Sequence, residues 1–270
     1  MRPFHLLGLA VVVSLAPSTP LRAQEVADAD WHLEGLRTGF CIQLLLDPAS
    51  DAAHNLPAGF RALPASEAKD LHTSLRDVIA SQSEFASWAP SRLCFQAVDT
   101  IRSSEFLVKG KRDRPQLFGF WTMRAASAAG EAKNVVLALY TSSGRVARAV
   151  GKLGPEVREG RLRMGKVPTV DEDGVPSSDD RFEVKLGKTL ITWDGRLVSD
   201  TVRLKEPVLA EWALKGGEGG MTLTPEFARS MVGALKVEGK DDFAQALKAS
   251  PTRFAGPAYQ GGSAVVRLRK

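Results

Sequence analysis

The chain has 270 residues, of which 36 are Lys or Arg and 31 are Asp or Glu, giving a net charge of +5 at pH 7. So mild a basic excess does not by itself indicate a protein that binds nucleic acid or a membrane surface. A chain of this length forms one or two domains and buries most of its surface, so its fold does not depend on many disulfides.

Residues 1–23 have the layout of a secretory signal peptide. Arg2 supplies a positive start, residues 6–15 form an apolar run, and Ala23 offers a small residue for cleavage before Gln24. The alternative is a buried N-terminal helix; the apolar run is too short to cross a bilayer as a helix. We therefore expect a secreted or periplasmic protein with a single α+β domain over residues 24–270 and no transmembrane segment after cleavage.

The two cysteines, Cys41 and Cys94, each lie inside an apolar run. In an oxidising compartment an even pair indicates one disulfide, which stabilises the fold by about 4 kcal/mol through loop closure. The alternative is a redox-active pair, which usually requires closely spaced and exposed thiols. We therefore predict a structural disulfide between Cys41 and Cys94.

Strand patterns dominate the first half of the chain. Short runs rich in aromatic and β-branched residues, punctuated by Gly or Pro, favour strands over helices. The predicted strands cover residues 39–46, 92–98, 105–109, 116–124 and 134–141. Residues 125–133 are expected to form the hairpin loop between the last two strands.

Residues 187–195 (GKTLITWDG) contain the tail of the phosphate-binding P-loop signature. The full signature needs a glycine five residues before Gly187 and a helix after Thr189, but Phe182 stands at the first place and a strand pattern follows. A second partial match, residues 160–166, is followed by Val167 and so lacks the magnesium-binding hydroxyl. A nucleotide site is therefore not predicted.

The same region has the pattern of an antiparallel meander. Phe182, Val184 and Leu186 alternate with charged residues, which predicts a half-buried strand. Asp194-Gly195 lies between two strand patterns and predicts a hairpin turn. The stretch 187–195 is thus expected to be a turn, a strand and a second turn.

Three helices are predicted, over residues 66–82, 224–239 and 241–249. In the second, Phe227, Met231 and Leu235 recur at every fourth position after a Thr-Pro start. A final strand is predicted over residues 263–269. Strands first, helices late and no regular βαβ alternation indicate an α+β fold. We expect a mostly antiparallel β-sheet, of meander, half-barrel or sandwich type, with about three helices, one early and a pair near the C-terminus.

Residues that could carry catalysis or bind metal are scarce. Beyond the signal peptide the only histidines are His32, His54 and His72, without zinc-site spacing, and no nucleophile motif occurs. The acidic stretch 171–180 lacks the EF-hand spacing and is expected to be a solvated loop, with an irregular calcium site as the alternative. The sequence therefore predicts no catalytic residue, no metal and no cofactor.

A basic segment is the first candidate binding site. Its cations could hold an anionic polymer or lipid head groups, although the acidic stretch after it could also neutralise them on a solvated face. No aromatic residue is interleaved, so single-stranded nucleic acid is not an expected partner. The anion-binding candidates are Arg145, Arg148, Arg158, Arg161, Arg163 and Lys166.

Aromatic residues on predicted strands are the second candidate binding site. They could line an apolar ligand cavity, or simply form the core. The ligand-binding candidates are Phe118, Phe120, Trp121 and Trp193.

These observations favour a non-catalytic secreted binding protein over an enzyme. The expected partner is a small apolar ligand or an anionic surface polymer. The alternative is a secreted hydrolase whose catalytic residues are dispersed along the chain, because triads and carboxylate pairs assemble in space without a local motif.

Overall fold

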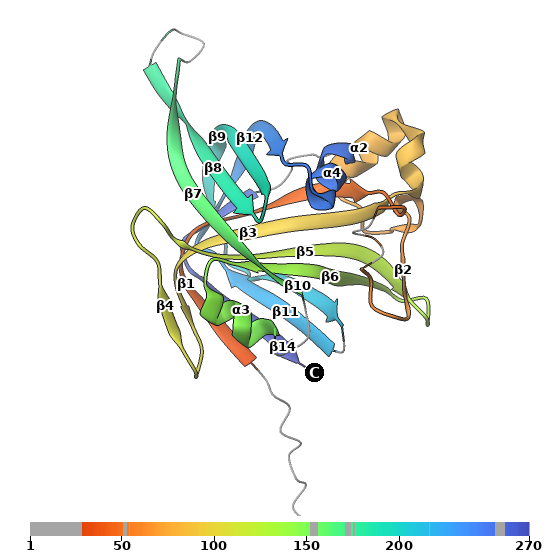
Figure 1. Cartoon of the computed structure of the whole chain (residues 1–270). Helices are drawn as coiled ribbons and strands as arrows, with labels where there is room; N and C mark the ends of the chain where they lie inside the picture. The colour runs from red at the N-terminus through yellow and green to blue at the C-terminus, as the bar shows by residue number, and fades with distance from the viewer. Residues whose placement is uncertain are drawn as a thin grey trace, which may run out of the picture.

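The computed structural model describes residues 29–269, apart from residues 51, 52, 54, 152–155, 171–173, 175, 216 and 252–256. The predicted signal peptide and the start of the acidic stretch therefore lie outside the described residues, as does His54. Most of the described chain is β-strand (Figure 1). The strands are β1 (Ala29–Leu46), β2 (Phe60–Ala62), β3 (Ala89–Arg102), β4 (Leu107–Lys109), β5 (Gln116–Ser127), β6 (Ala132–Thr141), β7 (Val157–Val170), β8 (Pro176–Leu186), β9 (Thr189–Arg203), β10 (Val208–Leu214), β11 (Gly217–Thr224), β12 (Phe227–Glu238), β13 (Pro257–Gln260) and β14 (Ser263–Arg269).

The strands form one sheet that closes on itself twice. The first ring runs through β1, β3, β5, β6, β7, β8, β9, β12 and β13 and returns to β1. The second ring runs through β1, β3, β5, β6, β10, β11 and β14 and also returns to β1. The strands β1, β3, β5 and β6 belong to both rings and are called the shared strands below. Only the pairings β6–β7 and β10–β6 are parallel among those described, which confirms the predicted antiparallel majority.

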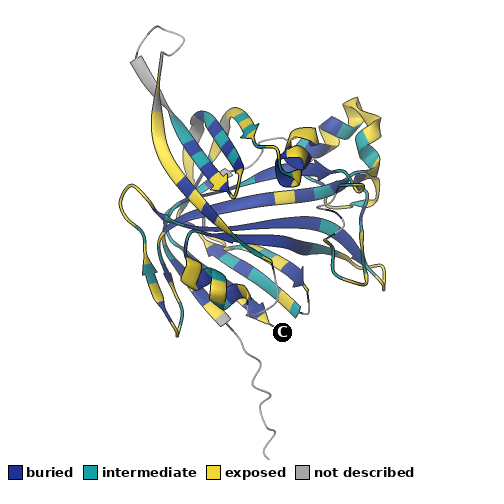
Figure 2. Ribbon diagram, in the orientation of Figure 1, coloured by how far each residue is buried: buried dark blue, intermediate teal, exposed yellow. Residues whose placement is uncertain are grey.

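Each ring encloses its own hydrophobic core, on opposite faces of the shared strands. Because successive side chains alternate between the faces of a strand, neighbouring residues enter different cores. Ile42, Leu93 and Trp121 lie side by side in the first core. Cys94 follows Leu93 on β3 and Phe120 precedes Trp121 on β5, and both of these side chains enter the second core. Figure 2 shows the shared strands as an almost continuously buried layer, which lies between the two cores. The fold thus places two cores back to back on one layer of backbone.

Three α-helices in the described part of the chain close the ends of the rings. Helix α2 (Thr73–Ser81), flanked by the 3-10 turns η1 (Ala65–Glu67) and η2 (Ser83–Ser87), packs on Leu45 of β1. Helix α3 (Gly144–Gly151) adds two valines to the second core. Helix α4 (Asp242–Ala249) closes the first core, where the rings of Phe243 and Trp121 lie 4.8 Å apart.

The helix predicted over residues 224–239 is wrong, because this segment is strand β12. A spacing of four positions satisfies a helix face, but it also satisfies a strand, in which every second residue points to the same side. Met231 is buried in the first core and Leu235 packs against it, so the observed spacing is that of a strand. The predicted C-terminal pair of helices is therefore the single helix α4, and the predicted helix over residues 66–82 is divided into η1 and α2.

Asp194-Gly195 is not a turn, and β9 continues through it. Gly195 pairs with Gly233 of β12 on one side and Asp180 of β8 on the other. A Cβ atom on Gly233 would collide with the backbone oxygen of Asp194, so glycine here permits close approach of two strands. The turn predicted at Gly187 is confirmed, since Gly187 has a φ of 59° between β8 and β9.

The polar start of α4 yields a prediction on pH dependence. Asp241 Oδ1 accepts hydrogen bonds from the Thr189 hydroxyl (2.6 Å) and the Ala244 amide (2.9 Å). Burial tends to raise the pKa of Asp241, but these hydrogen bonds outweigh it and hold the pKa below its usual value. Asp241→Ala should therefore lower the free energy of unfolding by about 1–2 kcal/mol at pH 7. Because the folded-state pKa is the lower one, this stabilisation is present above about pH 4 and is lost as the pH falls.

Urea unfolding of the wild type and of Asp241→Ala at pH 7 and pH 3 measures this effect. The difference between the two proteins should shrink at pH 3. Asp242→Ala, one residue along and exposed, is the matched control and should change the free energy by less than about 0.5 kcal/mol. An Asp241 effect that is equally large at both pH values would contradict the assignment.

Candidate functional site

A small cavity of about 70 Å³ lies on the second-core face of the shared strands, beside α2. Polar and charged side chains from β1, β3, β5 and the start of β6 form its floor, and the segment leading into α2 forms its wall. The polar residues that line it are Gln43, Asp70, His72, Ser91, Arg92, Thr122, Arg124 and Asn134.

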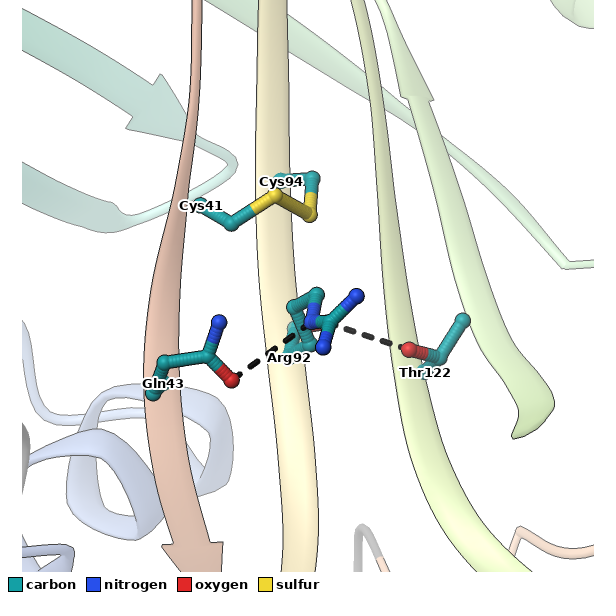
Figure 3. Close-up of a disulfide and its surroundings, with 5 residues drawn as sticks. All are labelled: Cys41, Gln43, Arg92, Cys94 and Thr122. Carbon is teal, nitrogen blue, oxygen red and sulfur yellow. Dashed lines mark hydrogen bonds between the residues drawn. A yellow bond between two sulfur atoms is a disulfide. The ribbon is translucent and has the colours of Figure 1, made fainter. Parts of the chain in front are cut away.

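The floor of the cavity follows from strand register. Cys41 of β1 pairs with Cys94 of β3, and two positions along the same face Gln43 pairs with Arg92. Thr122 of β5 is the next partner of Arg92. The predicted disulfide between Cys41 and Cys94 is present, and it lies directly beside the Gln43–Arg92 pair (Figure 3). The disulfide therefore cross-links the two strands that carry the cavity floor.

Arg92 is a cation in a recessed position. Its side chain is reached by solvent, yet it lies in the cavity and its Nε donates to Gln43 Oε1 at 3.5 Å. Burial lowers the pKa of Arg92, while the nearby groups Tyr259 and Asp70 act in the opposite direction. The guanidinium still remains protonated at neutral pH because the usual arginine pKa lies far above 7. A partly desolvated cation attracts an anion more strongly than one in open water.

Arg124 has an unused hydrogen-bond donor. One of its terminal nitrogens lies 2.9 Å from Asp70 Oδ2, which fixes the guanidinium above the floor. Its side chain is only 19% exposed, and its Nε is buried with no hydrogen-bond partner among the described residues. Buried polar groups are almost always paired in folded proteins, and a buried donor without a partner in the lining of a cavity indicates a missing partner. A ligand oxygen or a water molecule would supply it.

His72 contributes a second donor. It is the N-cap of α2, and its Nδ1 accepts from the Ser74 amide at 3.3 Å and lies 2.8 Å from the Ser74 hydroxyl. Since Nδ1 is an acceptor here, the neutral ring carries its proton on Nε2. The ring lines the cavity, so this N–H is available to a ligand there.

The cavity is thus rich in donors and contains one carboxylate. No lysine lines it, and among the described residues no group of three or more His, Cys, Asp or Glu is placed to hold a metal ion. Arginine side chains commonly bind a carboxylate or a phosphate through two parallel hydrogen bonds. The guanidinium groups of Arg92 and Arg124 can bind such an anion in this cavity. Asp70, 62% exposed and ion-paired with Arg124, is the carboxylate among the residues that line it.

The aromatic residues predicted to bind a ligand do not come together in one cavity. Phe118 and Phe120 lie in the second core, whereas Trp121 and Trp193 lie in the first, on the opposite face of the shared strands. All four are buried. Their role in ligand binding stays a prediction.

The basic residues predicted to bind anions lie elsewhere. Arg145 and Arg148 are on α3, and the other four are on β7, whose hairpin with β8 projects from the rest of the fold (Figure 1). Three of the β7 cations form ion pairs: Arg158 with Glu156 at 2.7 Å, Arg161 with Glu159 at 3.3 Å and Lys166 with Asp180 at 2.5 Å. None of the six lines the cavity, and their anion-binding role stays a prediction.

The residues of the cavity floor were missed by sequence reasoning. Arg92 and Arg124 fall within the predicted strands 92–98 and 116–124, but the sequence pattern assigns them no functional role. A signal was available, because each is a charged residue next to a run of apolar strand residues. Arg92 precedes Leu93-Cys94-Phe95, and all three of those residues are fully buried.

No known protein-family model matches the chain, and no curated protein sequence matches it. The chain is similar to solved structures of several enzymes. One is an acetoacetate decarboxylase-like enzyme from Sphingomonas wittichii RW1, with 10% identity, a TM-score of 0.48, and coverage of 90% of this chain and 92% of that one. Another is the enduracididine biosynthesis enzyme MppR complexed with pyruvate, with 11% identity, a TM-score of 0.44, and coverage of 89% and 88%. A third is an acetoacetate decarboxylase, with 12% identity, a TM-score of 0.40, and coverage of 94% and 92%.

This comparison corrects the function predicted from the sequence. The prediction of a non-catalytic binding protein is contradicted by this comparison, in which the solved structures are those of enzymes. At 10–12% identity the likeness transfers no substrate and no catalytic residue to this chain.

Proposed function

We propose that the chain is an enzyme whose active site is the cavity around Arg92 and Arg124, and that its substrate is a small organic acid bound by its carboxylate. The observation that carries the proposal is the buried Nε of Arg124, which has no hydrogen-bond partner in the described part of the chain. A carboxylate oxygen completes this donor, and Arg92 supplies a second cation in the same cavity.

The size of the cavity supports a small substrate. A water molecule needs roughly 10–15 Å³ of such volume, so about 70 Å³ accommodates a carboxylate and a few further atoms. The guanidinium of Arg124 is already fixed by Asp70 at 2.9 Å, so little side-chain freedom is lost when the acid binds.

The arrangement of donors supports a reaction in which negative charge grows on a substrate oxygen. With the carboxylate at the two guanidinium groups, a neighbouring carbonyl oxygen can accept a hydrogen bond from His72 Nε2, which stabilises an enolate in a partly desolvated site. Asp70 is the carboxylate positioned to take the proton from the adjacent carbon. We therefore propose proton transfer next to the carbonyl of an oxo acid as the reaction class.

Exchange of the methyl protons of pyruvate, the smallest 2-oxo acid, in D₂O tests this proposal by proton NMR. Arg124→Gln should lower kcat/KM for exchange by about 10- to 100-fold, because it removes a charged hydrogen bond to the carboxylate. Arg145→Gln, which removes an exposed cation on α3, is the matched control and should leave the rate unchanged. No binding and no exchange by the wild type, or equal rates in the two variants, would refute the proposal.

The compartment and the domain organisation are part of the same proposal. The structure has a disulfide, and among its described residues no helix is long and apolar enough to span a membrane. Together with the signal-like residues 1–23, these features support a secreted or periplasmic enzyme formed by residues 24–270 as one domain. Mass spectrometry of the exported protein should find Gln24 as its first residue.

A further inference from the structure

A second and larger cavity, of about 640 Å³, adjoins the proposed active site. It is an open groove between β10 and β11 on one side and the start of β6 on the other. Its lining includes Leu209, Trp212 and Met221 from the β10–β11 hairpin and Ala132, Lys133 and Asn134 from β6.

The groove exists because the second ring closes incompletely at this point. β10 and β6 pair through a single described position, Ala213 with Val135. Between Ala213 and Leu209, β10 remains paired with β11 along one edge. Along its other edge, no further residue of β6 pairs with it in the described chain. The Lys133–Glu218 ion pair, at 3.5 Å, links the two sides close to the closure. The groove therefore lies along β10 between Ala213 and Leu209.

Asn134 connects the groove with the active site. It lines both cavities, and it pairs with Arg124 across β5 and β6. A substrate whose carboxylate lies at Arg124 therefore has the groove as the neighbouring space past Asn134.

The surface of the groove fits an apolar chain more than a second charged group. Leu209 lines the groove and, at 66% exposure, is the most exposed large apolar side chain of the described residues. Gly219 and Gly220 leave the floor without side chains next to Trp212 and Met221. The charges, including Glu211, Glu218 and Arg267, carry both signs and so do not select for one charge.

We infer that the groove binds an apolar tail of the same acid, so that the substrate is an amphipathic oxo acid with its head in the small cavity and its chain along β10. This inference rests on the proposed function, because the head must be held at Arg92 and Arg124. Asn134 stands between head and tail, where its amide can bond a polar group at the start of the chain.

A chain-length series tests the inference. Straight 2-oxo acids from pyruvate to 2-oxodecanoate should bind about threefold to fourfold more tightly for each methylene that enters the groove, as measured by calorimetry. Leu209→Asp should flatten this dependence while leaving the affinity for pyruvate unchanged. Leu107→Asp makes the same change at a leucine that is 49% exposed on β4, and should leave the dependence intact.

A second variant keeps the test independent of charge. Ala132 is exposed on the β6 side of the groove, so Ala132→Trp should fill the groove. This variant should lower the binding affinity for the longest acids by at least tenfold without changing the affinity for pyruvate. Affinity that is flat with chain length while pyruvate binding still depends on Arg124 would overturn the inference and leave the proposed function standing. Length dependence unchanged in both groove variants would overturn it as well. Failure of every acid to bind would overturn both proposals.

Discussion

Replacing Leu93 by alanine is expected to lower the free energy of unfolding by about 2–5 kcal/mol, and the melting temperature by roughly 10 °C. Leu93 lies on β3, one of the shared strands, and is fully buried in the first core between Ile42 and Trp121. The loss is expected near the top of the range, because the rigid neighbouring strands cannot collapse into the cavity that the substitution leaves.

Leu107→Ala is the matched control for this prediction. Leu107 lies on β4 and is 49% exposed, so the same chemical change should cost less than about 0.5 kcal/mol there. Urea unfolding monitored by tryptophan fluorescence measures both. Comparable losses in the two variants would mean that β3 is not the buried centre of the sheet.

Removing the disulfide is the second change with a large expected effect. Cys41→Ala combined with Cys94→Ala should lower the free energy of unfolding by about 2–5 kcal/mol, because the bond joins residues 53 positions apart in the sequence. Alanine is the suitable replacement, since Cys94 is fully buried and a serine hydroxyl there would need a partner. Thermal unfolding with and without a reductant measures the effect.

The reductant supplies an internal control. Wild-type protein should lose stability when the disulfide is reduced, whereas the double variant should melt at the same temperature under both conditions. Because Gln43 and Arg92 lie two positions along the same two strands, the double variant should also bind pyruvate more weakly. A wild type that is indifferent to reduction would contradict the stabilising role of the bond.

The sequence predicted most of the strands, because their patterns are local. The predicted strands at residues 116–124 and 134–141 fall within β5 and β6, and residues 263–269 coincide with β14. The loop predicted over residues 125–133 is shorter in the structure, because β5 continues to Ser127 and β6 begins at Ala132. Local patterns did not predict helix α3, and they did not show that β12 is a strand rather than a helix. Residues 227–238 have a spacing that fits both periods, and the choice of strand is made by pairing with β9, which is distant in sequence.

The closure of the sheet into two rings was also beyond sequence reasoning. It depends on pairings between segments far apart in the chain, such as Ala213 with Val135. The candidate site is hidden for the same reason. Gln43, Arg92 and Thr122 form one row only because three strands pair in a particular register, and a shift by one residue would send them to the opposite face.

The pairing of β14 with β1 bears on how the protein is made. Residues 263–269 lie between β1 and β11 and supply the pairing that closes the second ring. Nearly the whole described chain must therefore be synthesised before β1 can pair with β14. Nascent chains should stay open to proteases and chaperones until then, and a truncation before residue 263 should be degraded rather than accumulate as a smaller stable protein.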